Sequence, residues 1–199
     1  MTKTHHIASV ILAFAFAISP LLTSAQSHTD TVSADDISRA IQTLLLQGIP
    51  EHNILPHPAH PMACNKELRD ELATGIKTAA DAYNVPPFLL VAIAFREGSF
   101  KNTAKGGIGE RSTFQMLPRI AKLAAAIDSR CNLKTYEGAA FCTAIWLNNL
   151  SAPKRCTSHE GALLKYATGY TCFPLRKKHV WIVKDRFGIA EQLAEFVRD

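Results

Sequence analysis

The 199-residue sequence lacks several patterns, and each absence excludes a class of structure or function. After residue 22 no apolar run is long enough to span a bilayer, and no C-x-x-C pair suggests a zinc site. Segments that alternate polar and apolar residues are scarce, which argues against a sheet. No nucleic-acid-binding motif is present, so we expect no nucleic-acid partner. Nothing in the sequence implies a cofactor or a resident metal ion.

The N-terminus has the pattern of a secretory signal peptide. Lys3 precedes an apolar run from Ile7 to Leu22, and Thr23-Ser24-Ala25 then supplies small residues for cleavage after Ala25. A retained membrane anchor is the second interpretation, and Ser19-Pro20 and the short run argue against it. We predict a signal peptide over residues 1–25, a periplasmic or secreted location, and no stable membrane span once the signal is removed.

All five cysteines lie after this segment: Cys64, Cys131, Cys142, Cys156 and Cys172. An exported chain can keep disulfides, and an odd number implies two bridges and one spare thiol. The four late cysteines cluster, so we predict Cys64 as the spare. Short loops around a helix favour the pairs Cys131–Cys142 and Cys156–Cys172, although other pairings of the same residues stay open.

The rest of the chain reads as a mainly helical, all-α protein. Ser33 and Asp36 predict a capped helix. Prolines then mark an extended strap up to residue 62. The strap also contains His52, His57 and His60, for which a metal site is the disfavoured interpretation. We therefore predict a short N-terminal helix and strap over 26–62 and one compact catalytic domain over 63–199. Its helices are expected from residue 66 to 83, before Glu97, and near 118–127, 136–150, 158–166 and 184–198.

Glu97 stands at the end of the most informative segment. Pro86 and Pro87 suit a helix start, an apolar run follows, and Gly98 is placed to end the helix. Burial and the negative end of the helix dipole both disfavour an ionised carboxylate, so Glu97 is suited to general acid catalysis. By itself the segment also fits an ordinary surface Glu at a helix end, with Arg96 as a solvated neighbour.

Two later segments give Glu97 a context. Gly109-Glu110-Arg111-Ser112-Thr113-Phe114-Gln115-Met116-Leu117-Pro118 places Gln115 18 residues after Glu97, and Lys165-Tyr166-Ala167-Thr168-Gly169 places Tyr166 69 residues after it. Together with Glu97, these segments resemble the soluble-type lytic transglycosylases, which show Gly-x-x-Gly-Leu-Met-Gln-x-Met-Pro and Ala-Tyr-Asn-Ala-Gly at such distances. The resemblance covers roughly residues 65–170. It implies a goose-lysozyme-like domain of the lysozyme-like α+β superfamily.

The resemblance also implies roles for individual residues. Glu97 would be the catalytic acid and then base, Gln115 would hydrogen-bond a bound sugar, and Tyr166 would place its hydroxyl against Glu97 or the substrate. A helix cap or a loop tie is the alternative for Gln115, and an aromatic core residue with a solvated hydroxyl is the alternative for Tyr166. Phe114 and Met116 would line the sugar cleft, although core packing suits both equally well. The chain departs from the family at Gly98, Ser112, Thr113 and Ala167, where the family usually has Ser, Gly, Leu and Asn.

The resemblance implies a peptidoglycan lytic transglycosylase that acts on glycan strands in the cell wall. Its small size and short N-terminal helix are similar to those of members that serve secretion or conjugation machines. Two alternatives stay open: a hydrolytic goose-type lysozyme, and a wall-binding or assembly factor with little turnover.

Overall fold

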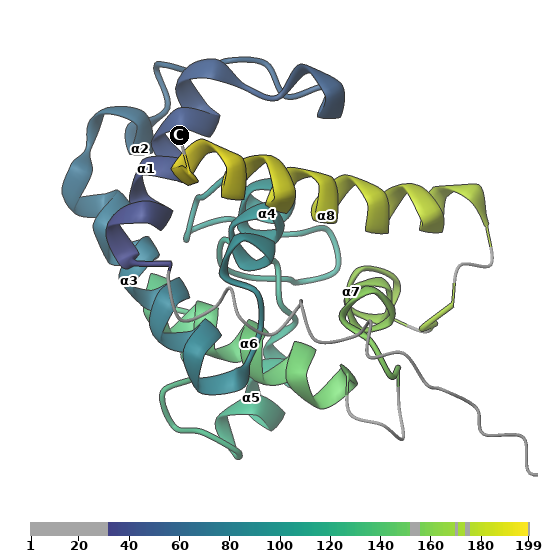
Figure 1. Ribbon diagram of the computed structural model, residues 1–199. Helices are drawn as coiled ribbons and strands as arrows, with labels where there is room; N and C mark the ends of the chain where they lie inside the picture. The colour runs from purple at the N-terminus through teal and green to yellow at the C-terminus, as the bar shows by residue number, and fades with distance from the viewer. Residues whose placement is uncertain (1–31, 152–155, 170, 174–175, 199) are drawn as a thin grey trace, which may run out of the picture.

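The computed structural model describes residues 32–151, 156–169, 171–173 and 176–198, and the predicted signal peptide lies outside this part of the chain. The described residues are mostly helical and include no strand, in agreement with the all-α prediction (Figure 1). The elements are α1 (Ala34–Gln47), η1 (Pro50–His52), α2 (Pro61–Cys64), α3 (Lys66–Tyr83), α4 (Pro87–Gly98), α5 (Pro118–Ala125), α6 (Tyr136–Ser151), α7 (His159–Thr168) and α8 (Lys177–Arg198).

Helix α4 is the central element of the core. Its residues from Pro87 to Ala94 are all buried, as the uninterrupted apolar run predicts. Pro86 is the N-cap and Pro87 the first helical residue, where a missing N–H breaks no helical hydrogen bond. The helix ends with Gly98, and Ser99 follows as its C-cap in the left-handed region at φ 46°.

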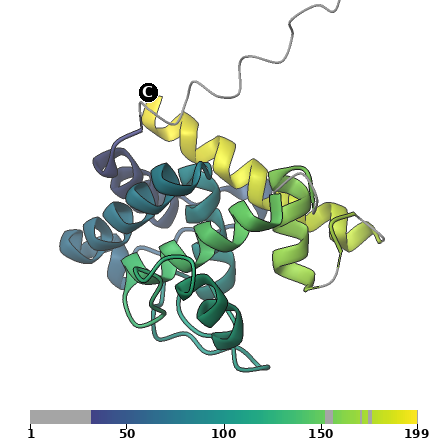
Figure 2. The same cartoon turned by 90° about the horizontal axis from the view of Figure 1, so that it is seen from below.

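The other helices surround α4. Helix α8 crosses over it, α1 and α3 pack together at one side, and α6 lies against α3 and α7 (Figures 1 and 2). The predicted cap of α1 is present: the Asp36 N–H donates to Ser33 Oγ at 3.1 Å, and the Ser33 N–H donates to Asp36 Oδ2 at 2.8 Å. Its apolar face packs on α3 and α8, so this helix is part of the main body of the protein.

The proline-rich strap is fixed at both ends. Ile49 and Ile54 are buried and pair in an isolated antiparallel bridge. Residues 55–59, which connect this bridge to His60, are exposed. His60 is buried: its Nδ1 accepts a hydrogen bond from the Met62 N–H at 3.1 Å, and its Nε2 lies 2.9 Å from the Ser99 carbonyl. The strap therefore reaches the C-terminal end of α4, two residues from Glu97.

Helix α8 begins at Lys177, seven residues before the predicted start at Lys184. Gly188, which argues against a helix by propensity, has a packing role. A Cβ atom at this position would lie 2.3 Å and 2.5 Å from two ring atoms of His52. The glycine thus lets the strap approach the helix backbone.

The structure confirms both favoured disulfides, Cys131–Cys142 and Cys156–Cys172, and leaves Cys64 free and exposed. One bridge ties the loop before α6 to that helix, and the other joins the segments on either side of α7. Bridges that close short loops typically contribute about 2–4 kcal/mol. They suit a protein that folds in an oxidising compartment. Within the described residues, no helix has the length and apolar character needed to cross a bilayer.

Candidate active site

Four of the five predicted site residues line one cleft of about 230 Å³. Glu97 comes from the end of α4, Gln115 and Met116 from the loop before α5, and Tyr166 from α7. The cleft wall also includes the three residues after Tyr166, from Ala167 to Gly169. Segments up to 69 residues apart in the sequence thus meet at one place.

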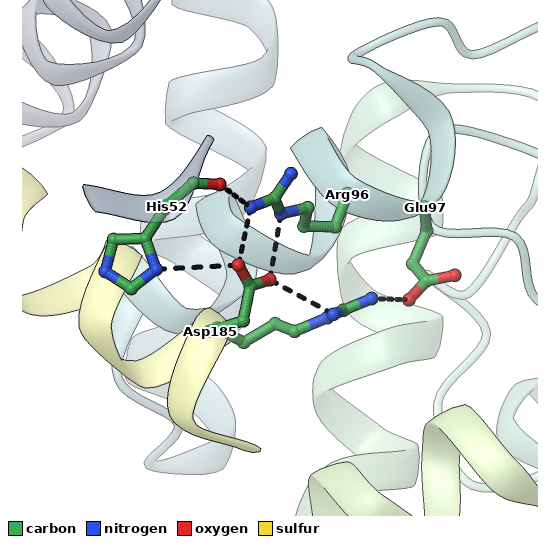
Figure 3. Close-up of polar contacts among 5 residues, drawn as sticks. His52, Arg96, Glu97 and Asp185 are labelled. Atoms are coloured by element: carbon green, nitrogen blue, oxygen red, sulfur yellow. Dashed lines mark hydrogen bonds and ion pairs between the residues drawn. The ribbon is translucent and has the colours of Figure 1, made fainter. Parts of the chain in front are cut away.

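Glu97 has a charged partner that the sequence analysis did not foresee. Its side chain is 24% exposed, and Oε1 accepts a hydrogen bond from Nη2 of Arg186 at 3.0 Å (Figure 3). The expected surroundings of this carboxyl group were apolar, and a guanidinium lies beside it instead. Arg186 lies 89 residues downstream on α8, so no local pattern around Glu97 reveals it.

The glycine after Glu97 explains how the cleft forms. A Cβ atom at Gly98 would lie 2.4 Å from the Thr113 carbonyl oxygen and 2.6 Å from the Thr113 Cα atom. The Thr113 hydroxyl donates to the Ala94 carbonyl at 3.3 Å, and Thr113 is fully buried. The end of α4 therefore rests directly on the backbone of the loop. Because of this contact, any side chain at position 98 would force the loop to shift. Only glycine at position 98 is compatible with the observed position of the Thr113 backbone.

The loop itself is a strained turn. Ser112 and Gln115 have φ values of 69° and 49°, in the left-handed region that residues other than glycine rarely adopt. An isolated antiparallel bridge between Arg111 and Met116 closes the turn. The Gln115 amide nitrogen donates to the Ser112 carbonyl at 2.9 Å, as the loop-tie alternative predicts. Its Oε1 atom is then the group that can accept a hydrogen bond from a ligand. Strain of this kind is typical of functional sites.

The structure corrects the expectation that Phe114 lines the cleft. Its side chain is 0% exposed and belongs to the hydrophobic core, so packing was the correct alternative. Met116 does line the cleft, although it is only 3% exposed.

Tyr166 contacts the turn rather than Glu97 directly. Its hydroxyl donates to the backbone carbonyl of Phe114. Burial raises the pKa of the Tyr166 hydroxyl well above its ordinary value, and the nearby Glu97 carboxylate acts in the same direction. The hydroxyl therefore stays protonated at neutral pH and remains a donor. Tyr166 thus fixes the turn that carries Gln115 while it lines the cleft beside the acid.

A buried charge cluster adjoins Glu97, and Figure 3 shows it. Asp185 is its centre: the carboxylate is 2% exposed, accepts from Arg96 Nε at 2.8 Å and from Arg186 Nη1 at 3.1 Å. Arg96 also donates to the His52 carbonyl at 2.6 Å, and His52 Nδ1 lies 3.5 Å from Asp185. Sequence analysis missed this cluster, and only the alternative of a surface Glu97 described Arg96, as a solvated neighbour. One signal was present, because Asp185 lies four and eight residues before the buried Ile189 and Leu193.

The remaining acids and histidines have simpler surroundings. Glu110 lines the same cleft as Glu97, and its carboxylate accepts a hydrogen bond from the Ile108 N–H at 3.0 Å. The strap histidines do not converge on a metal site: His52 joins the charge cluster and His60 caps α2. No group of three potential metal ligands occurs within the described residues.

Comparisons with known proteins give no match: no family model, no curated protein and no solved structure is similar to this chain. The functional argument therefore depends on the site itself.

Proposed function

We propose that this protein is an exported peptidoglycan lytic transglycosylase with a goose-lysozyme-like domain and Glu97 as its general acid and base. The observation that carries the proposal is the shared cleft of Glu97, Gln115 and Tyr166. Three separate sequence elements supply these residues, and each element matches its own part of the family pattern. An accidental match of short motifs gives no reason for the residues to meet in one cleft.

The backbone at the family departures supports the same proposal. Ser112 stands where the family usually has glycine, and its φ of 69° is a conformation that glycine adopts without strain. The Ser112 hydroxyl accepts from the Phe114 N–H at 3.3 Å, which offsets part of the strain. At position 98 the family's serine is replaced by glycine, and the contact with Thr113 leaves no room for a side chain. The departures thus fit an altered contact surface around a retained turn.

The proposed reaction needs one carboxyl group. Glu97 donates its proton to the oxygen of the β-1,4 bond between N-acetylmuramic acid and N-acetylglucosamine as the bond to C1 breaks. The acetamido oxygen of the same sugar stabilises the positive charge at C1. The 6-hydroxyl then attacks C1 and returns a proton to Glu97, which gives a 1,6-anhydro product without water. Positioned proton transfer of this type contributes about 10²–10⁴-fold to a rate.

Glu110 favours one specific alternative, a hydrolytic lysozyme. Most glycosidases use two carboxyl groups that flank the scissile bond, and Glu110 lines the cleft with Glu97. In that case Glu110 would activate a water molecule and the product would carry a reducing end. Replacing Glu110 by Gln distinguishes the two reactions, since a transglycosylase with a single acid does not require it.

The test uses the mature protein, the Glu97→Gln variant and purified cell-wall sacculi. Gln has nearly the same shape but cannot deliver a proton, so we expect lysis to fall at least 100-fold, the lower end of the range for general acids. Glu137→Gln, an exposed acid on α6, is the matched control and should lyse walls normally. Folding is checked by circular dichroism for each variant.

Mass analysis of the released fragments separates the candidate functions. Anhydro ends support the transglycosylase and reducing ends support the hydrolase. Binding without fragments points to a wall-binding or assembly factor, for instance in a secretion or conjugation machine. If Glu97→Gln is folded and still lyses walls within a few-fold of wild type, Glu97 is not the acid.

A further inference from the structure

We propose that Arg186 on α8 is a positioning residue for Glu97, held in place by Asp185 and Arg96. The proposal deepens the function proposed above and rests on it. It assigns α8, which lies outside the motifs that nominate the site, a direct part in orienting the acid.

Helices α4 and α8 are joined by two ion pairs, each between a residue of one helix and a residue of opposite charge on the other. Arg96 and Glu97 are adjacent on α4, and Asp185 and Arg186 are adjacent on α8. Arg96 binds Asp185, and Glu97 binds Arg186, with a separation of 89 residues in each case. Each basic residue thus meets an acid of the other helix. A rotation or slide of either helix would break both contacts together.

Asp185 makes this arrangement rigid. Its carboxylate is 2% exposed, and both of its oxygens accept from guanidinium groups. Arg96 is fixed in turn by the His52 carbonyl of the strap. Arginine suits this task because its planar fork of donors can serve two oxygens in fixed directions. Arg186 uses one arm for Asp185 and the other for Glu97 (Figure 3).

Stability alone does not account for the cluster. Removing charges from water costs free energy that their attraction often fails to recover, so buried ion pairs are weak stabilisers. Arg186 also has a buried Nε atom without a hydrogen-bond partner and a side chain that is 9% exposed. A purely structural contact would be served as well by apolar residues. The cluster instead ends at Glu97, the carboxyl group in the cleft that heads the sequence motifs.

The geometry assigns different tasks to the two oxygens of Glu97. Oε1 accepts the bond from Arg186, and Oε2 is directed away from that arm (Figure 3). In the proposed reaction Oε2 carries the proton to the glycosidic oxygen. Arg186 then stabilises the carboxylate that remains, and this carboxylate takes the proton from the attacking 6-hydroxyl. Arg186 therefore acts through Glu97, and its contribution belongs to the chemical step and not to glycan binding.

The experiment compares Arg186→Met and Arg186→Lys with wild type on a soluble, uncross-linked glycan strand. For Arg186→Met we expect kcat to fall about 10- to 100-fold, the loss typical of a displaced catalytic group, with KM within about twofold. Arg186→Lys keeps the charge, but its ammonium group reaches only one of the two acids. Its kcat should therefore lie between that of Arg186→Met and that of wild type. Arg130→Met removes another arginine that is paired with an acid, and it should keep wild-type kcat.

Chemical rescue separates positioning from a general structural role. Guanidinium at on the order of 10 mM, far below the molar range in which it unfolds proteins, should restore part of the kcat of Arg186→Ala. The same concentration of sodium chloride should not, and the melting temperature should stay unchanged. Recovery of kcat that depends on a parallel rise in melting temperature would indicate a structural role and overturn the proposal.

The outcomes also separate this proposal from the proposed function. If Glu97→Gln is inactive while Arg186→Met keeps kcat within twofold, the positioning role is wrong and the function stands. If Glu97→Gln lyses walls normally, or wild type releases no fragments, the function fails and the positioning role fails with it. Should Arg186→Met not fold, Arg186→Lys decides, because wild-type kcat in that variant contradicts a two-armed role.

Discussion

Two arginine–aspartate clusters in this protein show opposite designs. Asp128 and Arg130 are two residues apart in one loop, and their side chains are 12% and 52% exposed. Asp185 and Arg96 are 89 residues apart, and their side chains are 2% and 19% exposed. The first cluster can form in a short peptide, whereas the second exists only when α8 is docked on α4. The comparison teaches that the distant cluster, unlike the local one, makes the position of a side chain in the cleft depend on how two helices dock.

The local cluster has a clear electrostatic signature. Hydrogen bonds from the Arg130 side chain, and then from its backbone N–H and from Tyr83, hold the pKa of Asp128 well below its usual range. Arg130 also lies over the ring of Phe141, 4.1 Å from its centroid. These contacts lie near the surface, where water and salt screen charges strongly. They therefore organise the loop before α6 and contribute little to global stability.

The largest expected effect comes from breaking the distant cluster at its centre. Asp185→Asn leaves the half-buried Arg96 without its acid and the buried Arg186 with only Glu97 as a partner. Removal of one partner from a buried pair typically costs about 3–5 kcal/mol. Chemical denaturation should show this loss as a lower midpoint. Wall lysis should fall as well, because Arg186 loses the anchor that directs it to Glu97. A variant with normal stability and reduced lysis would show that the cluster serves catalysis alone.

A smaller effect is expected where the strap meets α8. In Gly188→Ala the new methyl group collides with the His52 ring, and overpacking of this kind typically costs about 1–3 kcal/mol. Combining it with His52→Ala removes the collision, and alanine in place of glycine then favours the helix by about 1 kcal/mol. Thermal denaturation of both single variants and the double variant measures the coupling. Additive effects would mean that the two residues do not press on each other.

The other strap histidine predicts a pH dependence. Burial lowers the pKa of His60, although its contact with the Ser99 carbonyl opposes the shift. Below its ordinary pKa of about 6.5, the unfolded chain therefore binds more protons at this site than the folded protein does. Stability falls as the pH drops below this value, by at most about 1.4 kcal/mol per pH unit for one proton.

His60→Asn tests this dependence while it keeps a side chain that can cap α2. The slope of melting temperature against pH between about 6.5 and 5 should be shallower than in wild type. Some slope should remain, because burial also lowers the pKa of His159. An unchanged slope would assign the dependence to other groups.

The smallest effect is expected for Asp128→Asn, the local counterpart of Asp185→Asn. Asn can still accept the bond from the Arg130 N–H that closes the loop, which measures 2.9 Å in wild type. Exposed ion pairs often contribute nothing measurable, so melting temperature and wall lysis should both stay close to wild type. A loss as large as that of Asp185→Asn would remove the distinction between the two clusters.

The sequence by itself determined what depends on near neighbours. Caps and apolar periodicity located the helices, and short loops favoured the disulfides that the structure contains. The family resemblance nominated Glu97, Gln115, Met116 and Tyr166, which do share a cleft. The helices and disulfides could be predicted because hydrogen bonds within a helix and the closure of short loops act over short distances along the chain.

Only the tertiary structure decided the surroundings of Glu97 and the direction of Phe114. Asp185 lies on the apolar stripe of α8, which indicates that it is buried, but a stripe does not name the partner that compensates its charge. Phe114 turns into the core because the strained backbone of its loop sets the direction of each side chain. Both outcomes depend on contacts between segments that are far apart in sequence, and the docking of α8 on α4 is what places a guanidinium beside the acid.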